Sequence, residues 1–234
     1  MRRALSSDAA ALPWREAGVG TLAVRRYPRE PGAQSIDRYH DVPGAGSLIA
    51  RMVTVRERMK SSAFMTWGGD RGEARPLNLE LPFAAIGDSG VVVRLEFNWI
   101  DDLGLAMADL DAGPPHLEQH RRGPLRLAGL AAGFDAHGLV PVLEQTTFRE
   151  KFALVDEAGE ERFQLNIDHV VAQSLDTGRQ GVFVDIDIAP TGAVDVSTLA
   201  RLECLSAALM QRYGLRPVLA TKAWRGAQAT AYRA

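Results

Sequence analysis

The fold is decided by residues 147–152, which read Thr-Phe-Arg-Glu-Lys-Phe. Side chains alternate across a β-strand with a period of two, so Arg149 and Lys151 share one face while Phe148 and Phe152 lie on the other. A strand of this kind either turns its charged face to solvent or uses it to line a polar cavity. The function depends on which of these two arrangements the chain adopts.

Four further segments repeat this pattern, and basic segments are interspersed with acidic ones. Their charged or polar rows are Arg56, Arg58 and Lys60; Arg94, Glu96 and Asn98; Gln164, Asn166 and Asp168; and Asp185 with Asp187. On periodicity alone, a solvated face is the favoured interpretation of Asp185 and Asp187, because like charges repel each other on a buried face. If the rows face inward instead, they offer cations for an anion and carboxylates for a metal.

The remaining chain is predicted to be a β-rich α+β domain. Strands are expected at 21–24, 48–60, 77–86, from Val91 onward, near 139–154, 161–171 and 181–189, and at 218–224. Helices are expected at 124–132 and from a Ser197 cap to Tyr213, where Gly214 supplies a left-handed stop. Short turns between successive strands favour antiparallel pairing. Residues 1–18 are predicted to form a loose arm, 101–123 a long loop, and 19–234 a single domain.

The bulk composition limits the function classes. The 234 residues are 46% hydrophobic and carry a formal charge of −2, which favours neither a nucleic acid duplex nor an anionic membrane as a partner. No apolar run approaches the roughly 20 residues that span a bilayer, so we expect a cytoplasmic protein without membrane insertion. The lone cysteine, Cys204, is predicted to be a buried thiol.

The charged residues suit phosphate chemistry. A multivalent phosphate needs several Arg or Lys donors from different strands, and phosphoryl transfer normally needs a divalent metal held by oxygen ligands. The sequence offers both sets. The cations are Arg56, Arg58, Lys60, Arg149, Lys151 and Lys222, and the carboxylates are Glu96, Asp168, Asp185 and Asp187.

The order of these motifs resembles the triphosphate tunnel metalloenzymes. The succession is Tyr39-His40-Asp41-Val42-Pro43, Arg56-x-Arg58, Glu96-x-Asn98, Arg149-x-Lys151, Asn166-x-Asp168, Asp185-x-Asp187, a Leu-rich helix, and Thr221-Lys222-Ala223-Trp224. The resemblance covers about residues 37–225, is best over 139–225, and is closer to the VTC-like polyphosphate polymerase branch than to the CYTH branch.

The resemblance implies a closed, tunnel-like antiparallel β-barrel with a few peripheral helices. Its lumen would bind polyphosphate, tripolyphosphate or a nucleoside triphosphate, with Mg²⁺ or Mn²⁺, for hydrolysis or polymerisation. Carried over by position, Arg56, Arg58, Arg149, Lys151 and Lys222 would bind substrate, and Glu96, Asp185 and Asp187 would bind the metal. Asp168 and Lys222 would be catalytic, with Asp168 orienting a base or the water around the metal.

Two departures from the family pattern keep alternatives open. Asn98 stands where the family has a lysine, and no Glu-x-Glu-x-Lys strand precedes residue 37. The first alternative is a non-catalytic anion-binding or scaffold domain of the same fold, with a protein partner or a second copy of the chain. The second is an unrelated β-sandwich whose charged rows face water.

Overall fold

A computed structural model describes residues 21–27, 34–42, 44, 47–60, 77–86, 91–98, 129 and 132–232. The predictions for the arm at 1–18, the loop at 101–123 and most of the helix at 124–132 lie outside these residues.

One antiparallel sheet contains all the described strands. The strands are β1 (Ala23–Arg26), β2 (Gln34–Asp41), β3 (Thr54–Lys60), β4 (Leu77–Ile86), β5 (Val91–Asn98), β6 (Val140–Val155), β7 (Glu161–Ser174) and β8 (Gln180–Pro190). Their order is β5-β4-β3-β2-β6-β7-β8, and β1 pairs with the far end of β6. The predicted strands near 139–154, 161–171 and 181–189 and the hairpin after residue 77 are confirmed. Strand β2 was not among the predicted strands.

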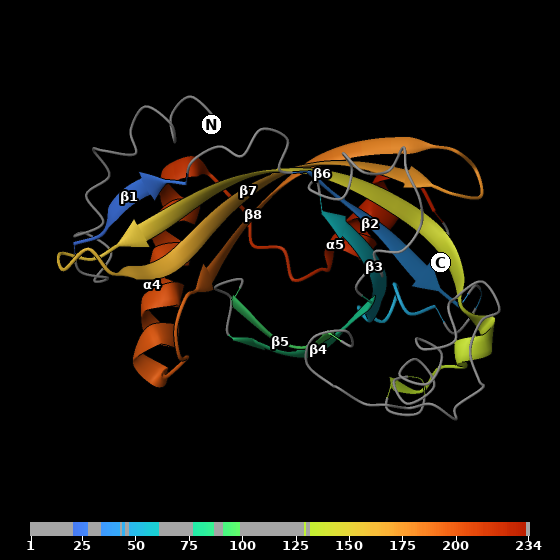
Figure 1. The fold of residues 1–234 in the computed structure, drawn as a ribbon, viewed down its shortest axis with the longest axis horizontal. Coiled ribbons are helices and arrows are strands. Elements are labelled where there is room, and N and C mark those ends of the chain that lie inside the picture. The colour runs from blue at the N-terminus through green and yellow to red at the C-terminus, as the bar shows by residue number, and fades with distance from the viewer. Residues whose placement is uncertain are drawn as a thin grey trace.

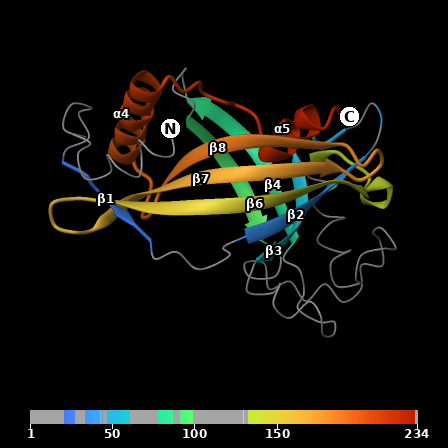
Figure 2. The ribbon, with the colours of Figure 1, turned by 90° about the horizontal axis from the view of Figure 1, so that it is seen from above.

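The sheet curls without closing into a barrel. Strands β6, β7 and β8 run side by side, and β4 and β5 pass beneath them at a steep angle (Figures 1 and 2). In the described part of the chain, β5 and β8 are the two ends of the strand order and do not pair with each other. The prediction of a closed barrel is therefore wrong, and the sheet is a half-barrel.

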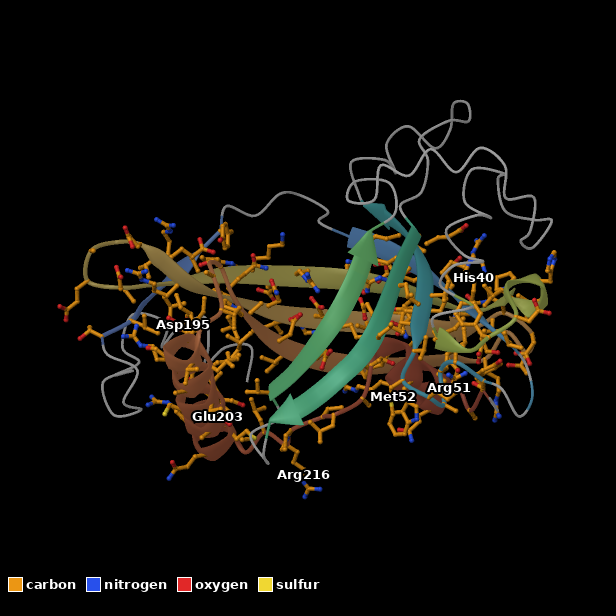
Figure 3. The ribbon with its side chains drawn as sticks, turned by 90° about the horizontal axis from the view of Figure 1, so that it is seen from below. His40, Arg51, Met52, Asp195, Glu203 and Arg216 are labelled. Atoms are coloured by element: carbon orange, nitrogen blue, oxygen red, sulfur yellow. The ribbon has the colours of Figure 1, made fainter. Side chains whose placement is uncertain are left out.

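Helix α4 (Val196–Tyr213) lies at the opening between these two edges. Its buried Leu202, Leu205 and Leu209 pack in one core with Val91 of β5 and with apolar residues of β6 and β7. The helix contacts both β5 and β8, so it fills the gap where these two strands would pair in a closed barrel. Asp195, labelled in Figure 3, caps it by accepting a hydrogen bond from the Thr198 amide at 2.6 Å, so the prediction of a Ser197 cap is wrong.

Of the two further predictions for α4, the stop at Gly214 is confirmed and the burial of Cys204 is not. Gly214 has a φ of 62°, as a left-handed stop requires. Cys204 is exposed, because it lies off the leucine stripe that faces the core, so the prediction of a buried thiol is wrong. None of the described helices is long and apolar enough to cross a membrane.

The predicted closing strand at 218–224 is also wrong, because its second half begins a helix. Helix α5 (Lys222–Ala229) starts after Thr221, whose side chain accepts a hydrogen bond from the Trp224 amide at 3.2 Å. Its sequence, KAWRGAQA, is rich in strong helix formers. The helix packs across β6, β7 and β8 (Figure 1). Lys222 is its first residue.

Gly226 lets α5 approach the sheet. A Cβ at this position would collide with the Gln145 side chain and with Leu143. We expect Gly226→Ala to lower the free energy of unfolding by about 1–3 kcal/mol, because overpacking outweighs the gain of about 1 kcal/mol in helix propensity. Urea unfolding measures this, with Gly192→Ala as the control because nothing lies within 4 Å of its added Cβ. Equal stability of the two variants would contradict this packing.

Candidate functional site: a charged pocket inside the half-barrel

A pocket of about 600 Å³ opens inside the curl of the sheet. It is bordered by strands β2, β3, β4, β5, β6 and β8 and by the two helices. Its charged lining residues are Arg56 and Arg58 from β3, Glu80 from β4, Arg149 from β6, Asp185 and Asp187 from β8, and Lys222 from α5. Residues far apart in the sequence therefore meet in one space.

The first charge cluster is built on Asp168 of β7. Its side chain is fully buried and opposes Arg149 on β6 and Asp185 on β8 in the strand register. Arg149 donates Nε and Nη2 to the two Asp168 oxygens at 2.6 Å each. Lys222 Nζ donates to Asp168 Oδ2 at 2.5 Å. One buried carboxylate thus fixes two cations from different elements.

The second cluster is built in the same way on Asp37 of β2. This side chain is also buried, and it receives both Nε and Nη2 of Arg58 at 2.7 Å each. Arg56, itself 6% exposed, lies beside it and donates to Asn78 at 2.7 Å and pairs with Glu80 at 2.6 Å. These pairs hold the head groups of Arg56 and Arg58 at the wall of the pocket.

The two β8 carboxylates lie closer to the surface than Asp37 and Asp168. Their side chains are 20% exposed for Asp185 and 44% for Asp187. Asp185 accepts from Arg225 Nη1 at 2.5 Å and lies 3.8 Å from Lys222 Nζ. Asp187 lies 3.6 Å from Lys222 Nζ and 3.8 Å from Arg149, and its buried Oδ1 has no hydrogen-bond partner among the described residues.

Ion pairing overrides burial at both buried aspartates. Burial alone would raise the pKa of Asp37, but the hydrogen bond from Arg58 and the charge of Arg56 lower that pKa below its usual value. Asp168 has the same balance. Burial raises its pKa, but Arg149 and Lys222 together lower it by more, so the pKa of Asp168 lies below its usual value. Both groups are therefore ionised near neutral pH.

These lowered pKa values predict an acid-sensitive fold. A carboxylate with a lower pKa in the folded state stabilises the fold above its unfolded pKa, and this contribution is lost as the pH falls through the folded pKa. We expect the free energy of unfolding to fall below about pH 4, and to fall less steeply in Asp37→Asn than in the wild type. Urea unfolding from pH 7 to pH 2.5 measures both slopes, and equal slopes would contradict the assignment.

The structure brings most of the predicted site residues together. Arg56, Arg58, Arg149, Lys222, Asp185 and Asp187 line the pocket, and Asp168 lies beneath it. Lys151 is exposed and is not among the lining residues. Glu96 lies on β5 opposite Glu80 in the register, but its side chain is outside the described part.

Sequence reasoning missed Asp37, Glu80 and Arg225. Asp37 alternates with Tyr39 along β2, and this spacing is the only signal that could have placed it opposite Arg58. Arg225 follows Lys222 by three residues, so recognising α5 as a helix would have put both on one side.

Comparison with known proteins adds little to this geometry. No family model and no curated protein matches the chain. Among solved structures, the PH1819 protein from Pyrococcus horikoshii OT3 is similar at 14% identity, over 88% of this chain and 86% of that chain, with a TM-score of 0.38. A "putative adenylate cyclase" from Bacillus halodurans is similar at 12% identity, over 88% and 97%, with a TM-score of 0.43. Scores this low carry no argument about function, which must be drawn from the residues of the site.

Proposed function

We propose that the pocket binds a linear phosphate chain (tripolyphosphate, inorganic polyphosphate or a nucleoside triphosphate) together with a divalent cation, and that it supports phosphoryl transfer. The observation that carries the proposal is the convergence of Arg56, Arg58, Arg149 and Lys222, from β3, β6 and α5, on one pocket. Several cations from different elements are what a multivalent phosphate requires. The sequence resemblance to triphosphate tunnel metalloenzymes supports the same substrate class.

The arginines are held in a way that suits phosphate binding. Arg58 and Arg149 each use Nε and Nη2 for a buried aspartate, and both line the pocket. A guanidinium is a rigid fork with five N–H donors, and no hydrogen bond to a described residue occupies Nη1 of Arg58 or Arg149, so these donors remain for an anion in the pocket. Asp37 and Asp168 are thus positioning residues, which fix the donors before a ligand arrives.

The charge balance of the site favours joint binding of an anion and a cation. Among the described residues, the positive groups Arg56, Arg58, Arg149, Lys222 and Arg225 are matched by the negative groups Asp37, Glu80, Asp168, Asp185 and Asp187. A phosphate chain alone would meet no net positive charge from these ten groups. If a divalent cation takes over Asp187 and Oδ2 of Asp185, Lys222 is free to turn toward phosphate, while Arg225 stays on Oδ1 of Asp185.

The β8 carboxylates fit Mg²⁺ or Mn²⁺. No three His, Cys, Asp or Glu side chains within the described ranges form a complete metal cage. Mg²⁺ does not need one, because it is usually held by one or two carboxylates, substrate phosphates and water. Oδ1 of Asp187, which has no hydrogen-bond partner in the described part of the chain, is a suitable oxygen. When bound, the metal would supply charge neutralisation and polarise the phosphoryl group.

A second candidate is a non-catalytic polyphosphate-binding domain. It is favoured by the contacts of Arg225, Lys222 and Arg149 with Asp185 and Asp187, which leave these carboxylates paired with protein cations. In that case the pocket would bind phosphate without turning it over.

Removal of Asp185 separates the two candidates. We expect Asp185→Ala to abolish Mn²⁺-dependent phosphate release from tripolyphosphate and ATP, and to leave metal-free tripolyphosphate binding intact, because a negative charge is lost. Calorimetry with and without Mn²⁺, alongside a phosphate-release assay, measures both effects. Binding by the wild type without any turnover would support the second candidate, and equal Mn²⁺ dependence in Asp185→Ala would exclude this residue as a metal ligand.

A further inference from the structure

A second pocket of about 410 Å³ adjoins the charged pocket. We infer that it receives the aromatic ring of an organic triphosphate, so that the chain acts on a triphosphate ester and not on a bare phosphate chain. This inference rests on the proposed phosphate site, because the phosphates of such a ligand would lie in the first pocket.

The two pockets share part of their lining. Asp185, Ile186, Ile188, Ser206 and Val218 line both of them. The boundary thus runs along β8 and crosses the segment between α4 and α5. A single ligand can therefore occupy both pockets, with its charged end beside Lys222 and its other end beside α4.

The second pocket differs in chemistry from the first. Most of the residues that line it are apolar, among them Val184, Leu209, Met210, Leu215 and Pro217, and polar groups make up the rest of its wall. Its volume falls in the range of pockets that hold small organic molecules. Apolar side chains give no favourable interaction to a phosphate oxygen, whereas a ring gains free energy by leaving water.

Arg225 gives this pocket a flat polar surface. Its guanidinium donates Nη1 to Asp185 at 2.5 Å and Nη2 to the Val184 carbonyl at 3.0 Å, which fixes its plane. One face of that plane lies over the Phe183 ring, 4.5 Å from its centroid. A guanidinium stacks on aromatic rings, so the other face is a platform for a ligand ring.

Two charged residues in the lining of the second pocket, Asp185 and Arg216, suit a ligand that extends from the charged pocket. Arg216 lines the second pocket and is exposed, and in Figure 3 it extends outward from the segment that follows α4. Asp185 sits between the pockets and contacts a cation from each side, Lys222 at 3.8 Å and Arg225 at 2.5 Å.

The test compares ligands with and without a ring. The probes are tripolyphosphate and the β,γ-imido analogues of ATP and CTP, and calorimetry gives the Kd of each with Mg²⁺. Met210→Trp adds bulk to the second pocket at a residue that does not line the first. We expect it to raise the Kd of both nucleotide analogues about tenfold or more and to change that of tripolyphosphate by less than about twofold.

Two further variants keep the result interpretable. Leu219→Trp is the matched control, because Leu219 is 51% exposed and lines neither pocket. Met210→Ala removes contact with the ligand without adding bulk, so it should also weaken nucleotide binding. It serves as the test if Met210→Trp fails to fold. If the Met210 variants leave nucleotide binding unchanged while tripolyphosphate still binds, the ring site is wrong and the phosphate site stands. If no probe binds the wild type, the proposed function itself is wrong.

Discussion

Replacement of Asp168 by alanine is expected to lower the free energy of unfolding by about 3–5 kcal/mol, the range for removing one partner of a buried ion pair. The Asp168 side chain is fully buried and holds both Arg149 and Lys222. Its loss would leave two cations near each other without their carboxylate, and these cations are only 25% and 18% exposed. Urea unfolding at pH 7 measures the difference.

A surface pair supplies the control for this experiment. Glu160 lies 2.7 Å from Arg162, but the two side chains are 64% and 46% exposed. Because solvent screens exposed pairs, Glu160→Ala should cost no more than about 1 kcal/mol. An Asp168→Ala variant as stable as Glu160→Ala would show that Asp168 does not hold the site together.

The second large effect concerns the affinity for phosphate. We expect Arg149→Ala to weaken tripolyphosphate binding by about 1.5–3 kcal/mol, roughly ten- to a hundred-fold, because a charge-assisted contact is lost. Lys151 is two residues away on the same strand, yet it is exposed and outside the pocket. Lys151→Ala should therefore leave the affinity nearly unchanged, and calorimetry with Mg²⁺ compares the two variants.

This pair of variants distinguishes specific contact from general charge. If both substitutions weaken binding equally, the phosphate interacts with the overall positive charge of β6 and not with the pocket. If neither substitution has an effect, Arg149 is not a ligand of the phosphate. A thermal midpoint for each variant shows that a loss of affinity is not a loss of fold.

The sequence predicts the long β6–β8 strands well, because alternation is regular there and turn residues separate the strands. It also predicts α4, whose leucines follow a helical period. It fails at residues 218–224, where the resemblance to a strand motif outweighed the helix-forming composition that follows Thr221. The prediction of a closed barrel is wrong for the same reason, because closure needed a strand at residues 218–224.

The site is predicted in its residue types better than in its contacts. Periodicity identifies Arg56, Arg58, Arg149 and Asp185 as members of charged rows, but it treats Lys151 in the same way. Whether a row reaches the pocket depends on the twist and curl of the strand, which a period of two does not encode. The partners Asp37 and Arg225 depend on the register of β2 and on the helical nature of α5, so neither could be read from a local pattern.

Binding of a multivalent phosphate together with a metal in the pocket can be measured by a thermal-shift titration. Tripolyphosphate is added with and without Mn²⁺, and sulfate at matched ionic strength is the control. We expect a saturable rise in Tm that sulfate does not give and that Mn²⁺ strengthens, equivalent to about 2.7 kcal/mol at 100 times Kd. A rise no larger than that with sulfate would contradict this binding.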